Sequence, residues 1–177
     1  MREGDKAVIR PLVESDLPKL AAWDQDPEIA RLMGGTPRDG AASRERYQKL
    51  MRDRNSVAMA IEGPHGDLIG EIELTEIAWR SGDAELIIRI GDRRFWGRGY
   101  GTDAVAAMLD VAFEEMNLRR VYLRVCEDNP RATKCYEKCG FRREGVVSRR
   151  LGDGQEPRVI VLMTIMREDY LRLKVAS

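Results

Sequence analysis

Residues 94–102 form the run Arg94-Phe95-Trp96-Gly97-Arg98-Gly99-Tyr100-Gly101-Thr102, between a predicted strand over 85–90 and a predicted helix over 102–116. Its glycines let the backbone turn tightly and approach a ligand closely. Free N–H groups at the start of a helix bind phosphate, and the arginines of the run add charge-assisted hydrogen bonds. We interpret the run as a cradle for a pyrophosphate. An ordinary glycine-rich connection between a strand and a helix is the alternative.

Two common phosphate-binding motifs are absent from the sequence. The P-loop pattern GxxxxGK[ST] has no match. The dinucleotide pattern GxGxxG is broken, because Gly97 and Gly99 place Thr102 where the third glycine belongs. The strands predicted before the run are antiparallel rather than part of a βαβ series. ATP and NAD are therefore disfavoured as ligands.

Outward from this run, the hydrophobic residues follow either helical or strand periodicity. Helical spacing, with Asp26 and Asn129 as N-caps before a proline, predicts helices over 16–23, 27–33, 43–52, 102–116 and 130–139. Strand patterns predict strands over 7–12, 57–61, 68–77, 85–90, 121–125, 141–150 and 158–166, the last two forming a hairpin closed around Asp153-Gly154. The sum is a single α+β domain over 1–177, with a mostly antiparallel central sheet flanked by helices.

Charges are balanced over the whole chain but not along it. The sequence holds 30 Lys and Arg against 30 Asp and Glu. Residues 1–85 hold 17 acidic and 12 basic side chains, a net charge of −5, whereas residues 86–150 hold 9 acidic and 14 basic, a net charge of +5. This distribution indicates an anion-binding middle and a more acidic remainder, or an uneven scatter of surface charge. A uniformly basic nucleic-acid-binding protein is not indicated.

Several other classes of protein are also disfavoured. The first residues lack the apolar core of a signal peptide, and no apolar stretch approaches ~18 residues, so we expect neither secretion nor a membrane span. The three cysteines lack CxxC spacing and His65 is the only histidine, so we expect no metal, no disulfide framework and no Ser-His-Asp triad. Cys126 and Cys135 are interpreted as small core residues rather than nucleophiles. The expected compartment is the reducing cytoplasm.

Two separated motifs carry a resemblance to a known family. The spacing Arg94-x-x-Gly97-x-Gly99 resembles the acetyl-CoA signature [QR]xxGx[GA] of the GNAT N-acetyltransferase superfamily. The block that runs from Asn129-Pro130-Arg131-Ala132 to Tyr136 and Gly140-Phe141 is similar to that family's second cofactor-contacting segment. Phrases near the start and in the middle of the chain, Ile9-Arg10-Pro11-Leu12, Asp16-Leu17 and Ala84-Glu85-Leu86, resemble the RimJ/RimL-type branch, which includes ribosomal-protein and spermidine acetyltransferases. The resemblance spans residues 7–170.

The resemblance implies a fold and a set of acetyl-CoA contacts. The strands over 85–90 and 121–125 would splay apart, and the pantetheine arm would enter the gap and pair with the first strand. Acetyl-CoA would be the cosubstrate, held without a metal. The residues expected to bind it are Ile88, Ile90, Arg94, Trp96, Gly97, Arg98, Gly99, Tyr100, Gly101, Thr102, Asn129 and Ala132.

The resemblance also implies a direct transfer with few catalytic groups. An amine would attack the thioester without an acyl-enzyme, so a nearby histidine is not required. Tyr136 resembles the family's general acid, and an aromatic residue packed in the core is its alternative role. Glu85 is the expected base, acting through water, with Glu73 on an adjacent strand in reserve. A solvated strand carboxylate is the alternative role for Glu85.

The acceptor is expected to be a primary amine: a peptide N-terminus, a polyamine or another small cationic amine such as an aminoglycoside. The acidic first half of the chain suits such a cation, with Trp23, Glu28 and Glu73 as substrate-binding candidates. A non-catalytic acyl-CoA-binding or regulatory domain of the same fold is the competing hypothesis. Neither nucleic acid nor a membrane is expected as a partner. The oligomeric state is left open; members of the family are often dimers, and a late strand or the segment 170–175 could support a homodimer.

Overall fold

One mixed sheet organises the molecule. The computed structural model describes residues 2–3, 6–150 and 156–176. In these ranges the strands follow the order β1-β2-β3-β4-β5-β6-β8-β7, and every neighbouring pair is antiparallel except β5 and β6, which are parallel. The strands are β1 (Arg2–Glu3), β2 (Val8–Pro11), β3 (Val57–Glu62), β4 (Leu68–Ala78), β5 (Asp83–Ile90), β6 (Arg120–Cys126), β7 (Arg142–Arg149) and β8 (Arg158–Met166). The predicted fold class is confirmed.

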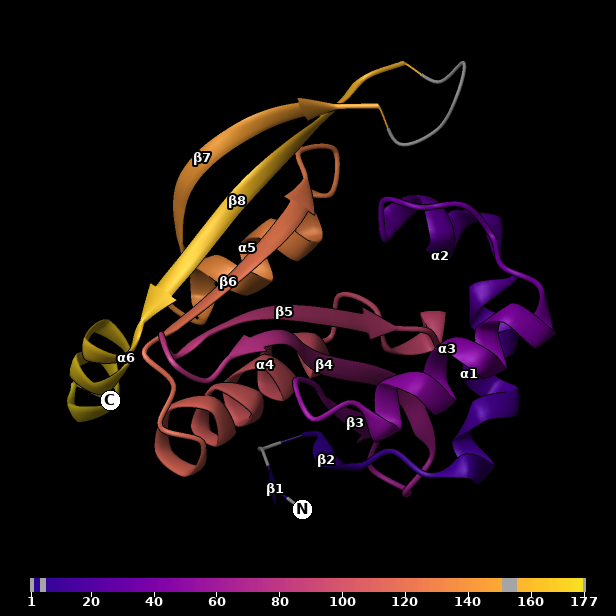
Figure 1. Ribbon diagram of the computed structural model, residues 1–177, viewed down its shortest axis with the longest axis horizontal. Helices are drawn as coiled ribbons and strands as arrows, with labels where there is room; N and C mark the ends of the chain where they lie inside the picture. Colours follow the sequence, from indigo (N-terminus) through magenta and orange to yellow (C-terminus); the bar gives the residue numbers. More distant parts are fainter. Residues whose placement is uncertain (1, 4–5, 151–155, 177) are drawn as a thin grey trace.

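Helices cover both faces of this sheet (Figure 1). The helices are α1 (Leu17–Asp24), α2 (Pro27–Leu32), α3 (Gly40–Arg52), α4 (Tyr100–Asp110), α5 (Pro130–Lys138) and α6 (Arg167–Val175). The larger core lies against α4, where Ile72 and Leu86 of the sheet meet Met108 of the helix. A smaller core on the opposite face joins Leu20 of α1 and Tyr47 of α3. Burial of apolar surface on two faces is what holds the layers together.

Local capping explains where several helices begin and end. Asp26 accepts hydrogen bonds from the backbone N–H groups of Glu28 and Ile29 at the start of α2. Asn129 accepts one from Ala132 at 3.2 Å, and each of these two caps is followed by a proline at the first helical position. Gly140, with φ of +95°, follows the end of α5 in the left-handed conformation that glycine tolerates. These capping predictions are confirmed.

Strands β5 and β6 pair for only three residues and then separate. Asp83, Ala84 and Glu85 of β5 pair with Arg120, Val121 and Tyr122 of β6. Beyond Glu85, β5 continues beside β4 alone, while β6 continues beside β8. Figure 1 shows the resulting opening between β5 and β6, with α5 on one side of it and α2 at its far end. The predicted splay is present.

Some boundaries differ from the sequence prediction. Helix α3 begins three residues earlier, because Asp39 accepts a hydrogen bond from the Ala42 N–H at 2.8 Å and caps it. The fourth predicted helix is α4, which begins at Tyr100 and passes at Val111 into a π-helical segment (Val111–Glu115). The turn residues Asp153-Gly154 lie outside the described residues. No helix among the described residues is long and apolar enough to cross a membrane.

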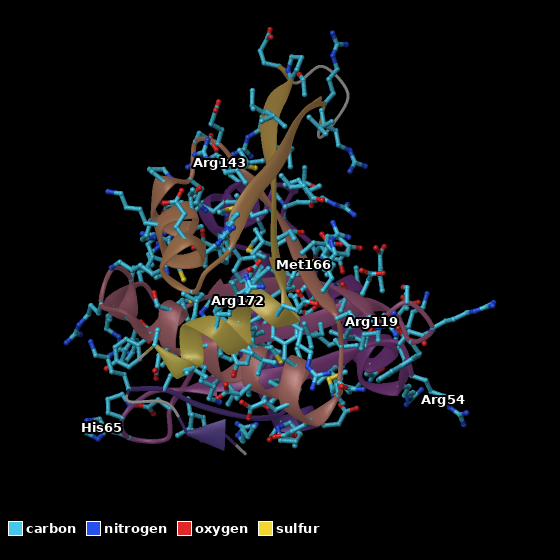
Figure 2. All side chains as sticks on the ribbon, turned by 90° about the vertical axis from the view of Figure 1, so that its left-hand side faces the viewer. Arg54, His65, Arg119, Arg143, Met166 and Arg172 are labelled. Atoms are coloured by element: carbon cyan, nitrogen blue, oxygen red, sulfur yellow. The ribbon has the colours of Figure 1, made fainter. Side chains whose placement is uncertain are left out.

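Helix α6 was not predicted as a helix, and it follows directly from β8. Figure 2 views this end of the molecule, with Met166 where β8 ends and Arg172 on α6. The Tyr170 ring lies 5.1 Å from that of Phe113, which attaches α6 to the segment after α4. In the same view the β7–β8 hairpin extends away from the body of the protein (Figure 2).

Candidate active site

A cavity of about 310 Å³ opens where β5 and β6 diverge, and we call it the splay cavity. Residues from α2, β5, the glycine-rich loop, the start of α4 and α5 surround it. Its lining is Ile29, Leu32, Met33, Ile88, Arg89, Ile90, Phe95, Trp96, Gly97, Gly99, Gly101, Thr102, Asn129, Arg131, Ala132, Lys134, Cys135, Tyr136 and Lys138. The volume is in the range of small-molecule sites.

The glycine-rich loop supplies backbone donors to this cavity. Gly97 and Gly99 have φ values of +69° and +90°. Residues that carry a Cβ atom disfavour this conformation, whereas glycine adopts it readily. Gly99 is the N-cap of α4, so the first N–H groups of an eleven-residue helix point out of its start beside the cavity. A helix N-terminus of this kind attracts anions. The loop therefore has the geometry of the predicted pyrophosphate cradle.

The edge of β5 that faces the gap offers main-chain groups. The Gly91 N–H donates to the Ile69 carbonyl of β4 at 2.9 Å. Because antiparallel strands direct alternate residues toward each other, Ile88 and Ile90 direct their main-chain groups to the opposite edge, where β6 has diverged. The Ile90 carbonyl is already occupied, since Trp96 Nε1 donates to it at 2.6 Å. Ile88 and the Ile90 N–H are the groups that this edge presents to a ligand.

Tyr136 lies on α5, and its side chain is buried at the wall of the cavity. Its ring packs edge-on against Phe141, with 5.9 Å between the ring centroids. Burial raises the pKa of Tyr136 well above its usual value, and the neighbouring thiols Cys135 and Cys139 act in the same direction. The phenol therefore stays protonated at working pH and can donate a proton or a hydrogen bond.

The charged residues of the splay cavity are basic. Among its described lining residues are Arg131, Lys134 and Lys138, and no aspartate or glutamate; Arg89 also lines it, but its guanidinium is paired with Asp24 and Glu71. The Arg131 guanidinium lies 4.0 Å from the centroid of the Trp96 ring, a cation–π contact that positions it at the loop. This lining suits a ligand that carries several phosphate charges.

Three predicted cofactor residues do not reach the lining. The Arg94 side chain is 78% exposed and pairs with Asp92 at 2.6 Å. Arg98 directs Nη1 to the Arg94 carbonyl at 3.3 Å, and Tyr100 is buried against Phe95 with 4.9 Å between ring centroids. The other nine, Ile88, Ile90, Trp96, Gly97, Gly99, Gly101, Thr102, Asn129 and Ala132, line the cavity together with Tyr136.

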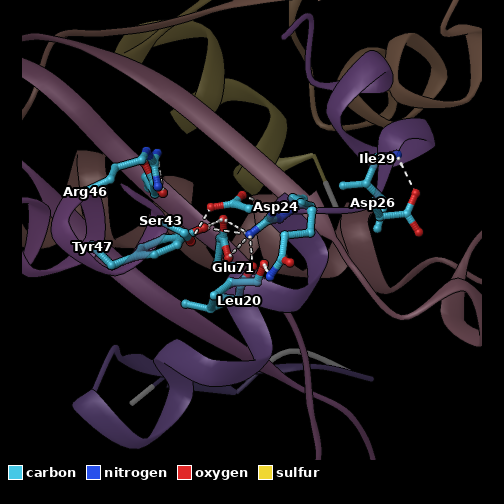
Figure 3. A network of polar contacts seen from close by, with 12 residues as sticks. Leu20, Asp24, Asp26, Ile29, Ser43, Arg46, Tyr47 and Glu71 are labelled. Atoms are coloured by element: carbon cyan, nitrogen blue, oxygen red, sulfur yellow. Dashed lines mark hydrogen bonds and ion pairs between the residues drawn. The ribbon is translucent and has the colours of Figure 1, made fainter. Parts of the chain in front are cut away.

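On the α1–α3 face of the sheet, carboxylates are paired with an arginine (Figure 3). Arg89 of β5 donates to Asp24 of α1 at 2.5 Å and to Glu71 of β4 at 2.9 Å. Tyr47 donates to Glu71 at 2.6 Å, and Ser43 donates to Asp24 at 2.6 Å. All five side chains are buried. This cluster, the Arg89 network, is a buried set of paired charges in which Arg89 Nε is left without a hydrogen-bond partner among the described residues.

The predicted substrate residues lie in three different places. Glu73 is fully buried, accepts two hydrogen bonds from Arg46 and lines a second, separate hollow on the α3 side. Burial raises the pKa of Glu73 to about 7. Glu28 pairs with Arg93 at 2.8 Å. The Trp23 ring packs against Gly91, where an added Cβ would lie 2.0 Å from it. None of the three lines the splay cavity as the described residues define it.

Glu85, the predicted base, lies where β5 and β6 part. It is 9% exposed, and Arg124 of β6 pairs with it at 3.4 Å. Burial raises the pKa of Glu85, Arg124 opposes that shift, and Glu76 adds to it. Tyr122, its neighbour on β6, donates to Glu76 at 3.1 Å. Glu85 is not among the described residues that line the splay cavity, so a proton from a ligand there would have to reach it through water.

Sequence reasoning missed two contributions to this region. Helix α2 brings the apolar side chains Ile29, Leu32 and Met33 to the cavity, and no local pattern indicates that contact. Lys6 donates from Nζ to the Arg98 carbonyl at 3.2 Å and lies 3.3 Å from the position of a Cβ on Gly99. Its basic type and its place before a strand do not indicate that contact either. The basic residues of α5, which follow the Asn129-Pro130 cap, could have been found from the second motif.

The splay cavity therefore defines a class of protein, one that binds a phosphate-bearing small molecule between two diverging strands. Residues 6–142 match the family described as "Acetyltransferase (GNAT) domain". The chain belongs to this family.

Characterised relatives of this chain are also N-acetyltransferases. The spermidine N(1)-acetyltransferase of Vibrio cholerae is 36% identical over 101 residues, which span 57% of this chain and 58% of that protein. The Escherichia coli K12 enzyme of the same name is 28% identical over 92% of this chain and 87% of its own length. A crystal structure of the V. cholerae spermidine N-acetyltransferase in complex with CoA and spermine superposes with a TM-score of 0.86 at 28% identity, covering 93% of this chain and 98% of that one. The family and these relatives confirm the predicted class, an acetyl-CoA-dependent N-acetyltransferase.

Proposed function

We propose that this enzyme transfers the acetyl group of acetyl-CoA directly to a primary amine of a polyamine such as spermidine. The observation that carries the proposal is the parting of β5 and β6 after Glu85, which opens a basic cavity onto the buried phenol of Tyr136. The likeness to spermidine acetyltransferases over most of the chain supports the acceptor.

Acetyl-CoA would enter with its phosphates at the glycine-rich loop. The backbone N–H groups beside Gly99, Gly101 and Thr102, with Arg131 and Lys134 of α5, would hold the pyrophosphate. The pantetheine arm would lie along the free edge of β5, where Ile88 offers main-chain groups. This path places the thioester in the deeper part of the gap, beside Tyr136.

The chemistry that follows needs one acid and one base. The neutral amine attacks the thioester carbonyl carbon, the carbon–sulfur bond breaks, and the thiolate takes the phenolic proton of Tyr136. Glu85 receives the proton of the amine through water; Glu73, the reserve candidate, is held by Arg46 in the separate hollow on the α3 side. Because the pKa of Glu85 is raised, the carboxylate is a stronger base than an exposed glutamate.

Two kinds of surface near the gap suit a polyamine. Glu85 and Glu76 at the vertex offer negative charge, each within 4.0 Å of Arg124. Leu32 at the end of α2 and Met33 directly after it offer apolar surface on the other side. A polyamine alternates cationic amines with methylene segments, so it can use both.

The test is a comparison of acceptors in an assay of CoA release, with the acetylated product identified by mass. Spermidine, spermine, an aminoglycoside and a peptide with a free N-terminus are each supplied with acetyl-CoA. We expect the highest kcat/KM with spermidine or spermine. A higher value with the peptide or the aminoglycoside would replace the acceptor but keep the enzyme class. Tight acetyl-CoA binding without CoA release for any amine would favour the non-catalytic acyl-CoA-binding domain.

We also propose a family branch, a domain organisation, a compartment and an assembly for this enzyme. We place the chain in the RimJ/RimL-type branch on its Ile9-Arg10-Pro11-Leu12 phrase, and we treat residues 1–177 as one domain. Three free cysteines suit the reducing cytoplasm. The exposed valines Val146 and Val147 on edge strand β7 suit a homodimer contact.

A further inference from the structure

Two thiols meet at the wall of the splay cavity. Cys135 and Cys139 lie one turn apart on and just after α5, and Cys135 lines the cavity. Thr102 Oγ1 donates to Cys135 Sγ at 3.4 Å, and Cys139 Sγ donates to the Thr102 carbonyl at 3.4 Å. Both thiols are therefore hydrogen-bonded to Thr102, the last residue of the glycine-rich loop. The sequence analysis interpreted Cys135 as a small core residue. In the structure Cys135 also lines the splay cavity.

The two thiols are chemically unequal. The neighbouring Cys139 thiol and the hydrogen bond from Thr102 both lower the pKa of the Cys135 thiol. The pKa of Cys139 is raised by its neighbour Cys135 and by burial. Cys126 on β6 differs from both, because it is buried and burial raises its pKa. Thiolate character and access together determine which cysteine reacts.

We propose that Cys135 is a site of reversible oxidation by peroxides, that Cys139 resolves the oxidised form, and that the resulting disulfide weakens acetyl-CoA binding. The Cys135 thiolate attacks one oxygen of hydrogen peroxide, the O–O bond breaks, and the departing hydroxide takes a proton to leave as water. Cys135 becomes a sulfenic acid and the peroxide is reduced. The Cys139 sulfur then attacks the Cys135 sulfur, the S–O bond breaks, and a second water leaves with the Cys139 proton.

The disulfide would change the cavity through Thr102. Residues four apart on a helix have Cβ atoms about 5–6 Å apart, whereas a disulfide needs about 3.5–4.5 Å. The last turn of α5 must therefore tighten, which it can do because Cys139 is already the C-cap residue and Gly140 follows it. Tightening removes both thiol contacts to Thr102, whose backbone belongs to the phosphate-binding helix start. If the shift of Thr102 removes one hydrogen bond to the phosphates, acetyl-CoA binding should weaken about tenfold.

The experiment maps the thiols by mass after treatment with hydrogen peroxide and alkylation of the remaining free thiols. We expect a peptide linkage between Cys135 and Cys139 in the unsubstituted protein, with Cys126 alkylated as the internal control. Excess acetyl-CoA should slow the reaction, because it fills the cavity. Reduction with dithiothreitol should restore acetyl-CoA affinity, measured by calorimetry.

Two variants separate the steps. Cys139→Ser should leave a sulfenic acid on Cys135 that dimedone traps, and Cys135→Ser should leave Cys139 unoxidised at the same peroxide dose. Equal oxidation of Cys126 and Cys135, or a disulfide that leaves acetyl-CoA affinity unchanged, would overturn the proposal. Thiol mapping does not depend on any acceptor, so its result is independent of the proposed polyamine activity.

Discussion

The two regions around β5 handle charge in opposite ways. In the splay cavity, basic side chains and helix N–H groups face open space without a carboxylate among the described lining residues. In the Arg89 network, Asp24 and Glu71 are buried and both pair with Arg89. One region keeps its charges available for a ligand, and the other uses them within the protein. A count of charges along the sequence cannot distinguish these two uses.

Most acidic side chains expected at the acceptor site are already paired with arginines of the protein. The acidic first half of the chain suggested a carboxylate-rich cleft for a cationic amine. Glu71, Glu73 and Asp24 are instead paired with Arg89 or Arg46. The vertex carboxylates Glu85 and Glu76 are left as the candidates for amine recognition, each sharing one partly exposed arginine.

The largest expected effect follows from removing the shared arginine. Arg89→Met should lower the free energy of unfolding by about 3–5 kcal/mol, because it leaves Asp24 and Glu71 buried without a counter-charge. Denaturant unfolding followed by circular dichroism measures this. Arg172→Met is the matched control, since Arg172 is 75% exposed in its ion pairs and should change stability by less than about 0.5 kcal/mol. Equal effects of the two variants would contradict the contrast between the regions.

The next largest effect is expected on the catalytic rate, from removing the phenol of Tyr136. Tyr136→Phe should lower kcat about 100-fold while the Kd for acetyl-CoA changes little, because the ring still packs on Phe141 but no proton is donated. Stopped-flow or steady-state CoA release gives kcat, and calorimetry gives Kd. Retention of full kcat would show that Tyr136 is a core aromatic residue.

A smaller effect should follow from weakening the phosphate site. Arg131→Met should raise the KM for acetyl-CoA about tenfold with kcat nearly unchanged, since a charge-assisted contact is lost. The difference from the unsubstituted enzyme should shrink as salt is added. Arg94→Met, at a side chain 78% exposed and paired with Asp92, is the control and should change KM less. A larger rise in KM for Arg94→Met than for Arg131→Met would indicate that Arg94 binds the pyrophosphate, as the sequence predicted.

The smallest effect is a shift in pH dependence. The base must be deprotonated, so kcat/KM should fall as pH drops through the raised pKa of Glu85. Arg124 favours the charged form of Glu85, and its loss in Arg124→Met should raise that pKa further. The acidic limb should then move to higher pH, and the shift should be small because Arg124 is partly exposed. Glu85→Gln should remove the limb, and an unchanged limb in both variants would transfer the role to Glu73.

Local signals in the sequence were sufficient for much of the fold and of the cavity. The Asp26-Pro27 and Asn129-Pro130 caps and Gly140 act through neighbours within a few residues, and they fix where helices begin and end. The glycine-rich loop and Tyr136 were found for the same reason. Contacts such as Arg89 with Asp24, 65 residues apart, depend on sheet register and helix docking. The neutralisation of Glu71 and Glu73 was therefore not predictable from spacing.

The central claim is direct transfer from acetyl-CoA to an amine that is bound at the same time. Initial rates of CoA release measured over a grid of acetyl-CoA and spermidine concentrations test it. We expect double-reciprocal lines that intersect, because both substrates must be bound together in a ternary complex. Parallel lines, with CoA released before spermidine binds, would contradict it and would point to an acyl-enzyme intermediate.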